Sequence, residues 1–471
     1  MFYQVKVPVE DRDFLRFYWW ENGNVDTEPN EYRMTVHLFR ATSSPSCSNY
    51  SLQNTAPENK DRFDSLVIDT LTKNMYVDIC LSSTDTEESA ISLIKNVTEL
   101  CKEGGFNMTK WTSNSQNVAR NVEEWNCGDD SLTDRALGVY WYITDDKLGF
   151  HINIKEKPST RRGILSIVSS IYDPIGIVSP FVLIAKSILQ GLCKKEIGWD
   201  EEIPNSELSS WNKWLSQLKG LGNIKIDRCY KPQHFKAIVL CQLHCFADAS
   251  DKGYGCVFYI RLVDEKGSIQ CSFLLGKSRV APLKSMTIPR MELTAATSAV
   301  RLGNMIIREI EYSFDDIYYY SDSMSVLRYI ANSKTRFHTF VANRLAVIHE
   351  STKVNQWHYI GTKENLADLA SRGATIEQFN RNPQWLRGPD VLWDKDIEFP
   401  QCAEDTSFIG NDSEVKKPVA VCTVESFEGT ERLISYFSNW ERLVTIPARF
   451  VLAANNFRNA RTVLKSTETE K

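Results

Sequence analysis

The segment from about residue 237 to residue 373 constrains the fold most, because its hydrophobic pattern switches between strand and helix spacing in a fixed order. Three strand-like runs come first, and helices and strands alternate after them. The runs are residues 237–250, 253–263 and 269–280 (strands), 289–311 (helix), 316–322 (strand), 323–333 and 337–352 (helices), 354–361 (strand) and 365–373 (helix). This order predicts a mixed α/β sheet.

Acidic residues recur where this sheet passes into a loop or a helix. Asp248 ends the first strand, and Glu292 lies in the first turns of the helix after the third strand. Asp322 ends the fourth strand, and Asp368 opens the last helix. Because such strand and helix ends can converge on one face of a sheet, we expect the four side chains to meet there. Several carboxylates at one place repel one another unless cations neutralise them.

Hard divalent cations, chiefly Mg²⁺ or Mn²⁺, suit a set of carboxylate oxygens. A pair of such ions about 4 Å apart can activate water and stabilise the leaving oxygen of a phosphodiester. A single acid after a strand is more often a helix cap or a solvated loop residue. Asp251, Asp315 and Asp316 are assigned to that class. The recurrence of four acids in one β-β-β-α-β-α-β-α order favours a metal site instead.

Four stretches of this segment resemble the ribonuclease H domain of BEL/Pao-type LTR retrotransposons. They are "FADASDKGYG", "PRMELTAA", "YYYSDSMSVLRYI" and "WHYIGTKENLADLASRG". The resemblance implies that the four acids bind two Mg²⁺ or Mn²⁺ ions and cleave the RNA strand of an RNA–DNA hybrid. Gly253 and Gly255 match small residues in the turn after the first acid. The loop between Trp357 and Asp368 is short, which favours a strand-end histidine at His358 over a mobile histidine that assists product release.

The rest of the chain resembles other parts of the same elements' pol polyprotein. The resembling parts are the reverse transcriptase palm (1–20 and 32–53), the region around the polymerase motif (75–111), the primer-contacting hairpin (137–150), a connection segment (164–190) and a helix that precedes the integrase (433–458). The first residues alternate apolar and polar side chains from the start, so we expect the chain to begin inside an element, as a truncated palm.

The resemblance divides the chain into four regions. They are a truncated reverse transcriptase palm (1–158), a helical connection or thumb-like region (159–235), an RNase H-like domain (236–375) and a loop-rich linker with a C-terminal helix (376–471).

Outside the RNase H-like domain, the spacing of apolar residues predicts further elements. They are strands over 1–20 and 32–39, a helix from about Pro45, a hairpin over 74–83, a helix over 86–101, a hairpin over 136–154, two helices within 161–193 split at 173–180, a polar stretch over 402–418 and a helix over 431–466.

The hairpin over 74–83 carries a departure from the polymerase pattern. The family motif reads Tyr-x-Asp-Asp, and this chain has Tyr76, Asp78 and then Ile79 in the place of the second aspartate. The first metal-binding aspartate of the palm would precede Met1. Polymerase chemistry needs two metal ions held by aspartates from both strands, so the resemblance implies a chain without polymerase activity.

Charge is distributed unevenly along the chain. The formal net charge is −5, but residues 161–375 hold 27 Lys and Arg against 20 Asp and Glu and are therefore +7. This middle block is the better place for a polyanionic partner. The resemblance implies an RNA–DNA hybrid or other nucleic acid as that partner, and it makes other pol-derived chains candidate partners.

The twelve cysteines show no paired spacing. "CQLHC" (Cys241, His244, Cys245) is the nearest to a zinc pattern, but no second pair follows, so buried strand cysteines are the favoured interpretation. No signal peptide precedes the first element, and no apolar run approaches the roughly 20 residues that cross a bilayer. We expect no membrane association and a reducing intracellular compartment, cytoplasmic or nuclear.

Three functions remain open from the sequence. The first is a two-metal ribonuclease H that acts on RNA–DNA hybrids. The second is a catalytically dead relic that binds nucleic acid or another partner, which the incomplete polymerase motif favours. The third is an aspartic peptidase, because the resembling region is also known as a Pao retrotransposon peptidase. No Asp-Thr-Gly or Asp-Ser-Gly triplet is present, which disfavours the peptidase.

Overall fold

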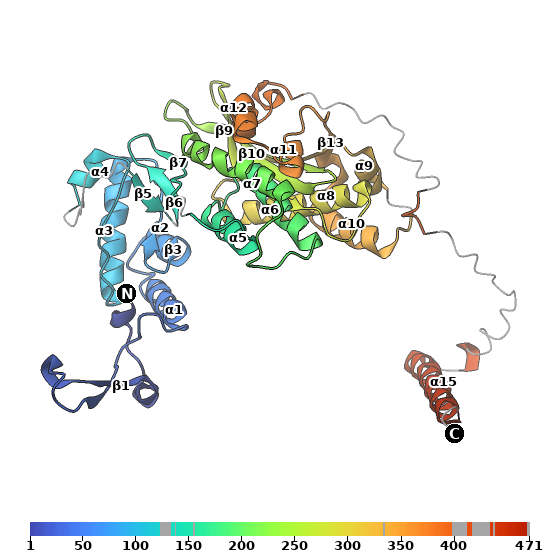
Figure 1. The fold of residues 1–471 in the computed structure, drawn as a ribbon, viewed down its shortest axis with the longest axis horizontal. Coiled ribbons are helices and arrows are strands. Elements are labelled where there is room, and N and C mark those ends of the chain that lie inside the picture. The colour runs from blue at the N-terminus through green and yellow to red at the C-terminus, as the bar shows by residue number, and fades with distance from the viewer. Residues whose placement is uncertain are drawn as a thin grey trace. The chain divides into compact units, whose positions relative to one another are not determined.

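The computed structural model describes residues 1–122, 133–136, 138–153, 156–332, 335–397, 412–416, 434–436 and 439–468. Figure 1 shows the helices and strands along the chain. The contacts divide the chain into two units, Met1–Val415 and Lys416–Lys471. The first unit contains every sheet of the described residues.

A five-stranded mixed sheet confirms the α/β prediction. Its strands are β9 (Ile238–Ala249), β10 (Gly253–Asp264), β11 (Ile269–Val280), β12 (Asp316–Ser321) and β13 (Trp357–Tyr359), in the order β11-β10-β9-β12-β13. The first three strands are antiparallel neighbours, whereas β12 runs parallel to both β9 and β13. Because β9 and β12 are adjacent and parallel, their C-terminal ends lie at the same edge of the sheet.

Helices cover both faces of this sheet (Figure 1). The face that we call the α8 face packs against α8 (Ile288–Glu309), α9 (Met324–Ala331) and α10 (Thr339–Ser351). The opposite face, the α11 face, packs against α6 (Ser179–Lys194) and α11 (Ala367–Arg372). Side chains alternate along β9, so Leu243 and Cys245 enter the α8-face core while Phe246 enters the α11-face core. Burial on both faces explains why β9 is almost continuously apolar.

The helical region before the sheet shares the α11-face core. It contains α5 (Arg161–Ser170), α6, α7 (Asn205–Gln217) and a 3-10 helix, η4 (Leu218–Asn223). The predicted break between two helices is confirmed at 171–178, where Asp173 accepts hydrogen bonds from the backbone N–H groups of Ile177 and Val178, both at 2.8 Å. The Gly276 N–H donates to the Ile175 carbonyl at 2.8 Å, so this turn contacts edge strand β11.

The N-terminal region differs from the prediction. The expected strand over 1–20 is wrong for most of its length, because the chain forms 3-10 helices η1 (Phe2–Gln4) and η2 (Val9–Leu15) before a short strand, β1 (Arg16–Trp19). The predicted strand over 32–39 is replaced by β2 (Asn30–Arg33), which pairs with β1, and η3 (Glu21–Gly23) lies between them. Every residue of β1 and β2 is exposed, so the alternating pattern does not mark a buried face here.

Most elements predicted from residue 44 to residue 150 are confirmed. They are α1 (Ser44–Glu58), the hairpin of β3 (Met75–Tyr76) and β4 (Ile79–Cys80), α3 (Glu87–Glu103), and the hairpin of β6 (Val139–Tyr142) and β7 (Lys147–Gly149). The sequence analysis did not define α2 (Ser65–Lys73), α4 (Gln116–Arg120), β5 (Thr133–Ala136) or β8 (Lys225–Asp227), of which β5 and β8 extend the second hairpin to four strands. A reverse transcriptase palm over 1–158 stays a prediction.

The described part after the sheet is mainly helical. It contains α12 (Ile376–Arg381), α13 (Gln384–Arg387), η6 (Asp390–Trp393) and α15 (Trp440–Glu468), while the short η5 (Val354–Gln356) directly precedes β13. The predicted helix over 431–466 is confirmed from Trp440, whereas 431–433 and 437–438 lie outside the described residues. Of the polar stretch over 402–418, only 412–416 are described. In the part of the chain that the structure describes, no helix combines the length and hydropathy that a membrane crossing requires.

Candidate active site

Three of the four predicted acids meet at the edge of the sheet where β9 and β12 end. One carboxylate oxygen each from Asp248, Glu292 and Asp322 lie within 4.8 Å of one another. Asp248 is the next-to-last residue of β9, and Asp322 follows the last residue of β12. Glu292 comes from the start of α8, which packs on the neighbouring end of the sheet. The parallel pairing of β9 and β12 therefore brings together residues that are 74 positions apart in the chain.

Burial makes this carboxylate group electrostatically costly. Asp248 is 3% exposed and Glu292 is 7% exposed. Burial, followed by the charges of Asp322 and Asp368, raises the pKa of Asp248 to about 7. Burial, followed by the charges of Asp248 and Asp322, raises the pKa of Glu292 to about 9. Protons or cations must therefore be taken up at this site near neutral pH.

Glu292 has an unused oxygen that suits a cation. The backbone N–H of Ala249 donates a hydrogen bond to the Glu292 carboxylate. Oε2 of Glu292 is buried and has no hydrogen-bond partner among the described residues. A buried carboxylate oxygen without a partner is unfavourable unless a proton or an ion occupies it. Three oxygen donors with this orphaned atom fit Mg²⁺ or Mn²⁺, which prefer such ligands.

Asp368 lies beside the three acids but outside their close group. Its carboxylate forms an ion pair with Arg372, one turn later in α11, and its charge contributes to the raised pKa of Asp248. Ser371, on the same helix, donates a hydrogen bond from Oγ to Oδ2 of Asp248. The fourth predicted acid, Asp368, therefore lies at the margin of the site. Ser371 links α11 to Asp248.

Sequence reasoning missed the polar side chains that hold the acids. Thr362 Oγ1 donates to Oδ2 of Asp322 at 2.8 Å, Ser371 donates to Asp248, and Arg372 neutralises Asp368. Ser371 and Arg372 stand three and four residues after Asp368, the spacing that places side chains on one face of a helix. That spacing is a signal that could have identified both residues.

Two glycines allow α11 to approach the site closely. Gly255 is paired with Asp248 across β10 and β9. A Cβ atom at Gly255 would lie 2.6 Å from the Ala370 Cβ atom and 2.6 Å from the Lys277 carbonyl oxygen. At Gly253 a Cβ atom would lie 2.5 Å from a backbone oxygen of β11. The expected small residues are therefore required by packing, because they let α11 bring Ser371 to Asp248.

The structure shows where the histidine and the two cysteines of "CQLHC" lie. His244 hydrogen-bonds through Nδ1 to the Tyr320 hydroxyl at 2.9 Å, and its ring stacks on the rings of Tyr318 and Tyr320. Cys241 and Cys245 point into the α8-face core from the opposite side of β9, so the three "CQLHC" side chains do not converge. The nine cysteines among the described residues are unpaired.

His358 lies within β13, in register with Tyr320 of β12. It is partly buried, and burial lowers its pKa. A position inside a paired strand confirms a strand histidine.

Basic side chains line a hollow on the α8 face of the sheet. A hollow of about 110 Å³ is lined by Lys277 and Arg279 of β11 and by Arg301 of α8, together with Gly255. All three basic side chains are exposed, and Gly255 is the cross-strand partner of Asp248. We call Lys277, Arg279 and Arg301 the basic cluster. Its exposed positive charge suits the phosphates of a nucleic acid.

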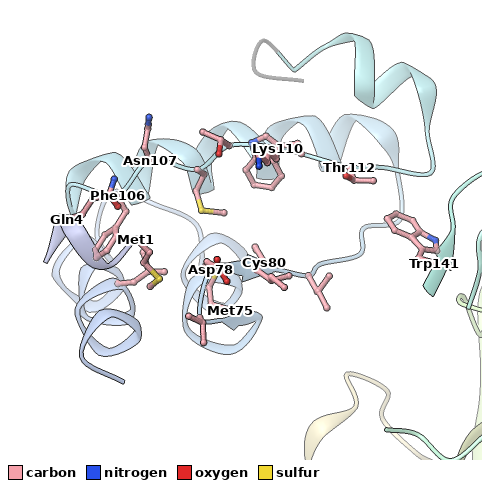
Figure 2. A pocket seen from close by; sticks show the side chains of 17 residues that line it. Met1, Gln4, Met75, Asp78, Cys80, Phe106, Asn107, Lys110, Thr112 and Trp141 are labelled. Atoms are coloured by element: carbon pink, nitrogen blue, oxygen red, sulfur yellow. The ribbon is translucent and has the colours of Figure 1, made fainter. Parts of the chain in front are cut away.

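The degenerate polymerase motif lies in the hairpin of β3 and β4. Asp78 follows Val77 in the hairpin turn and lines a cavity of about 480 Å³. Figure 2 shows Asp78 between Met75 and Cys80, with Asn107 and Lys110 on the segment across the cavity. Asp78 is the only acidic residue among those that line this cavity. The described residues therefore provide one carboxylate there and no second ligand of that kind.

Comparisons with known proteins give one family match. A family described as "Pao retrotransposon-like RNaseH-like domain" matches residues 160–323, which is less than half of the chain. No curated protein matches the sequence.

Solved ribonuclease H structures are also similar to part of the chain. The N-terminal RNase H domain of Rv2228c from Mycobacterium tuberculosis is 10% identical, covers 27% of this chain and 95% of its own, and has a TM-score of 0.20. RNase H1 from the halophilic archaeon Halobacterium salinarum is 14% identical, covers 30% and 98%, and has a TM-score of 0.18. LC11-RNase H1 in complex with an RNA/DNA hybrid is 12% identical, covers 30% and 99%, and has a TM-score of 0.19.

The family match contains the three acids that converge and ends before Asp368. It also begins at α5, in the region predicted as a separate helical connection. Residues 160–323 are therefore similar to a Pao retrotransposon-like RNaseH-like domain, within a chain that carries a five-stranded mixed sheet.

Proposed function

We propose that this chain is part of a retrotransposon pol polyprotein and that its RNase H-like domain hydrolyses the RNA strand of an RNA–DNA hybrid. The observation that carries the proposal is the convergence of Asp248, Glu292 and Asp322 from two parallel strand ends and one helix start. The family match to residues 160–323 supports the same reaction class.

Asp248, Glu292 and Asp322 are the residues that would hold Mg²⁺ or Mn²⁺, with Asp368 beside them for a second ion. Such ions supply Lewis acidity and lower the pKa of bound water. The chain itself fixes the acids: Ser371 orients Asp248, and Thr362 orients Asp322. Hydrogen-bond donors such as these commonly fix the orientation of the side chains that bind a metal ion.

The basic cluster would hold the phosphate backbone next to the acids. Lys277, Arg279 and Arg301 are free to exchange their solvent counterions for phosphates, which favours binding at low salt. Arg344 of α10 lies near Arg301, and burial followed by the charge of Arg301 lowers the pKa of Arg344. Recognition of the hybrid by groove shape and by the RNA 2′-hydroxyls would select the strand that is cut.

Cleavage of a labelled hybrid by the purified chain tests the proposal. We expect RNA fragments in the presence of Mg²⁺ or Mn²⁺ and none with a chelator. Asp322→Asn removes one of the three converging charges and should abolish the fragments. Asp251→Asn changes an exposed acid in the turn after β9 and should leave cleavage unchanged. Equal cleavage by Asp322→Asn and the wild type would overturn the assignment.

A catalytically dead nucleic-acid-binding protein is the second candidate. Its support is that Asp368 lies outside the close group of three acids and forms an ion pair with Arg372. Hybrid binding that saturates without cleavage in either Mg²⁺ or Mn²⁺ would favour this function. An aspartic peptidase is not proposed, because the sequence lacks the Asp-Thr/Ser-Gly triplet.

We propose further that the β3–β4 hairpin descends from a polymerase motif and no longer supports polymerisation. The support is the single carboxylate of Asp78, with Ile79 in the position of the second aspartate. Primer extension on an RNA template tests this: template-dependent incorporation above background by the purified chain would contradict it.

A further inference from the structure

A short segment far along the chain binds across the helices of the α8 face. This 412–416 segment lies 40 residues or more after α11 and contacts the beginning of α10. The His338 N–H donates to the Glu414 carbonyl at 2.8 Å, and Val415 forms an isolated β-bridge with Phe337. The Val415 side chain packs against the α8-face core. The part of the segment up to Val415 therefore belongs to the same unit as the sheet.

Two acidic side chains of the segment contact the helices that begin at the candidate active site. Glu414 forms a two-pronged ion pair with Arg290 of α8, with Nε–Oε1 at 2.6 Å and Nη2–Oε2 at 3.0 Å. The Glu414 side chain is 6% exposed, so water screens this pair weakly. The Tyr329 hydroxyl of α9 donates to Oδ2 of Asp412. The guanidinium of Arg290 also lies over the Phe340 ring of α10, 5.1 Å from its centroid.

These contacts act close to two of the three converging acids. Arg290 precedes Glu292 by two residues in the first turns of α8, and α9 begins two residues after Asp322. Glu292 itself has few polar restraints: it accepts one backbone hydrogen bond from Ala249, and its Oε2 has no partner among the described residues. The place of the Glu292 carboxylate therefore depends on where the first turn of α8 is held.

We propose that Glu414 is a positioning residue of the candidate active site, which it serves by fixing Arg290 and with it the first turn of α8. This inference rests on the proposed function in one respect, namely that Glu292 is a metal ligand. Glu414 touches neither the metal nor the substrate. It holds Glu292 at the distance from Asp248 and Asp322 at which the three carboxylates share a cation.

Two readouts on the full chain test the inference. The first is hydrogen exchange without metal, measured for backbone amides of residues 290–294. Glu414→Gln should exchange there at least about tenfold faster, because a hydrogen bond between charged groups stabilises a closed state by that factor or more. The second is Mn²⁺ affinity measured by calorimetry below the unfolding temperature of each variant. Glu414→Gln should bind Mn²⁺ about tenfold more weakly. A tenfold loss is the lower end of the range seen when a residue that positions a metal ligand without binding the metal is replaced.

The same chain offers a matched control. Glu309→Gln breaks the exposed Arg308–Glu309 pair at the other end of α8 and should change neither readout. Tyr329→Phe removes only the hydrogen bond to Asp412 and should shift both readouts in the direction of Glu414→Gln by a smaller factor. This second variant keeps the test decisive if Glu414→Gln does not fold.

The outcomes separate this inference from the proposed function. Wild-type exchange at 290–294 in both Glu414→Gln and Tyr329→Phe would overturn the positioning role. Faster exchange with unchanged Mn²⁺ affinity would also overturn it, because the segment would then stabilise α8 without placing Glu292. A wild-type chain that binds no Mn²⁺ would contradict the proposed metal function, while the exchange data would still decide whether Glu414 fixes α8.

Discussion

At the scale of single residues, the buried carboxylates link protonation to folding. The pKa of Glu292 in the folded chain is about 9, against an ordinary value of 4.5, and that of Asp248 is about 7, against 3.8. At a pH between the ordinary and the raised pKa of either group, the folded chain holds a proton that the unfolded chain has released. Stability of the metal-free protein therefore decreases as the pH rises through this window.

The sign of this linkage gives a prediction for Glu292→Gln. In the presence of a chelator, the wild-type free energy of unfolding should fall between pH 5 and pH 9, by at most about 1.4 kcal/mol per pH unit for each titrating group. The variant cannot ionise at this position, so its decline should be shallower. Urea unfolding at several pH values measures both slopes. Parallel slopes would show that Glu292 does not carry a raised pKa.

Saturating Mg²⁺ should reverse the trend in the wild type. Metal ions bind the deprotonated carboxylates, so their stabilising effect should increase with pH across the same window. The midpoint of thermal unfolding with and without Mg²⁺, compared at pH 6 and pH 9, measures this difference. A Mg²⁺-induced shift of the midpoint that is larger at pH 6 than at pH 9 would contradict the assignment of the cation to this group.

At the scale of elements, the close packing of α11 on β10 sets the distance between Ser371 and Asp248. Gly255→Ala adds a Cβ atom 2.6 Å from the Ala370 Cβ atom and from a backbone oxygen of β11. We expect a loss of about 1–3 kcal/mol in the free energy of unfolding, the range for overpacking. Gly191→Ala in α6, where a Cβ atom meets nothing within 4 Å, is the matched control and should be neutral or stabilising. An equal effect of the two substitutions, measured by urea unfolding, would contradict this packing role.

The sheet and its helices could be predicted because their sequence pattern and their burial agree. β9 is buried on both faces, and α8 has a strongly apolar stripe against the sheet, so each reads clearly in the sequence. The strand over residues 1–20 could not be predicted correctly. Alternation of apolar and polar residues identifies a strand only where one face is covered, and β1 and β2 are exposed on both faces.

The acids of the candidate active site could be predicted from their places at strand and helix ends, but the contacts between distant parts of the chain could not. The hydrogen bond from Thr362 to Asp322 and the ion pair from Arg290 to Glu414 join residues 40 and 124 positions apart. No local spacing encodes such contacts, because they arise from the tertiary arrangement. The ion pair of Asp368 with Arg372 is different, because its spacing of four residues in a helix can be read from the sequence.

At the scale of the whole molecule, charge is concentrated where nucleic acid would bind. The chain carries −5 overall, while residues 161–375 carry +7. Hybrid affinity should therefore fall steeply with salt. Arg279→Ala should weaken binding for every hybrid sequence and reduce the slope of log affinity against log salt by about 1.

Arg308→Ala provides the control for this measurement. Arg308 is an exposed arginine of α8 that is paired with Glu309 and lies outside the basic cluster. Fluorescence anisotropy with a labelled hybrid, recorded at several salt concentrations and with Ca²⁺ in place of Mg²⁺, yields the slopes. Equal slopes for Arg279→Ala and Arg308→Ala would place the phosphate contacts elsewhere on the surface.

Cleavage specificity of the intact chain tests the central claim most directly. A hybrid with a labelled RNA strand, an RNA duplex and a DNA duplex are each incubated with the wild type and with Asp248→Asn in Mg²⁺. We expect the wild type to cut only the RNA of the hybrid and the variant to lose at least about a hundredfold in rate. Hybrid cleavage by Asp248→Asn at the wild-type rate would show that the converging carboxylates are not the active site.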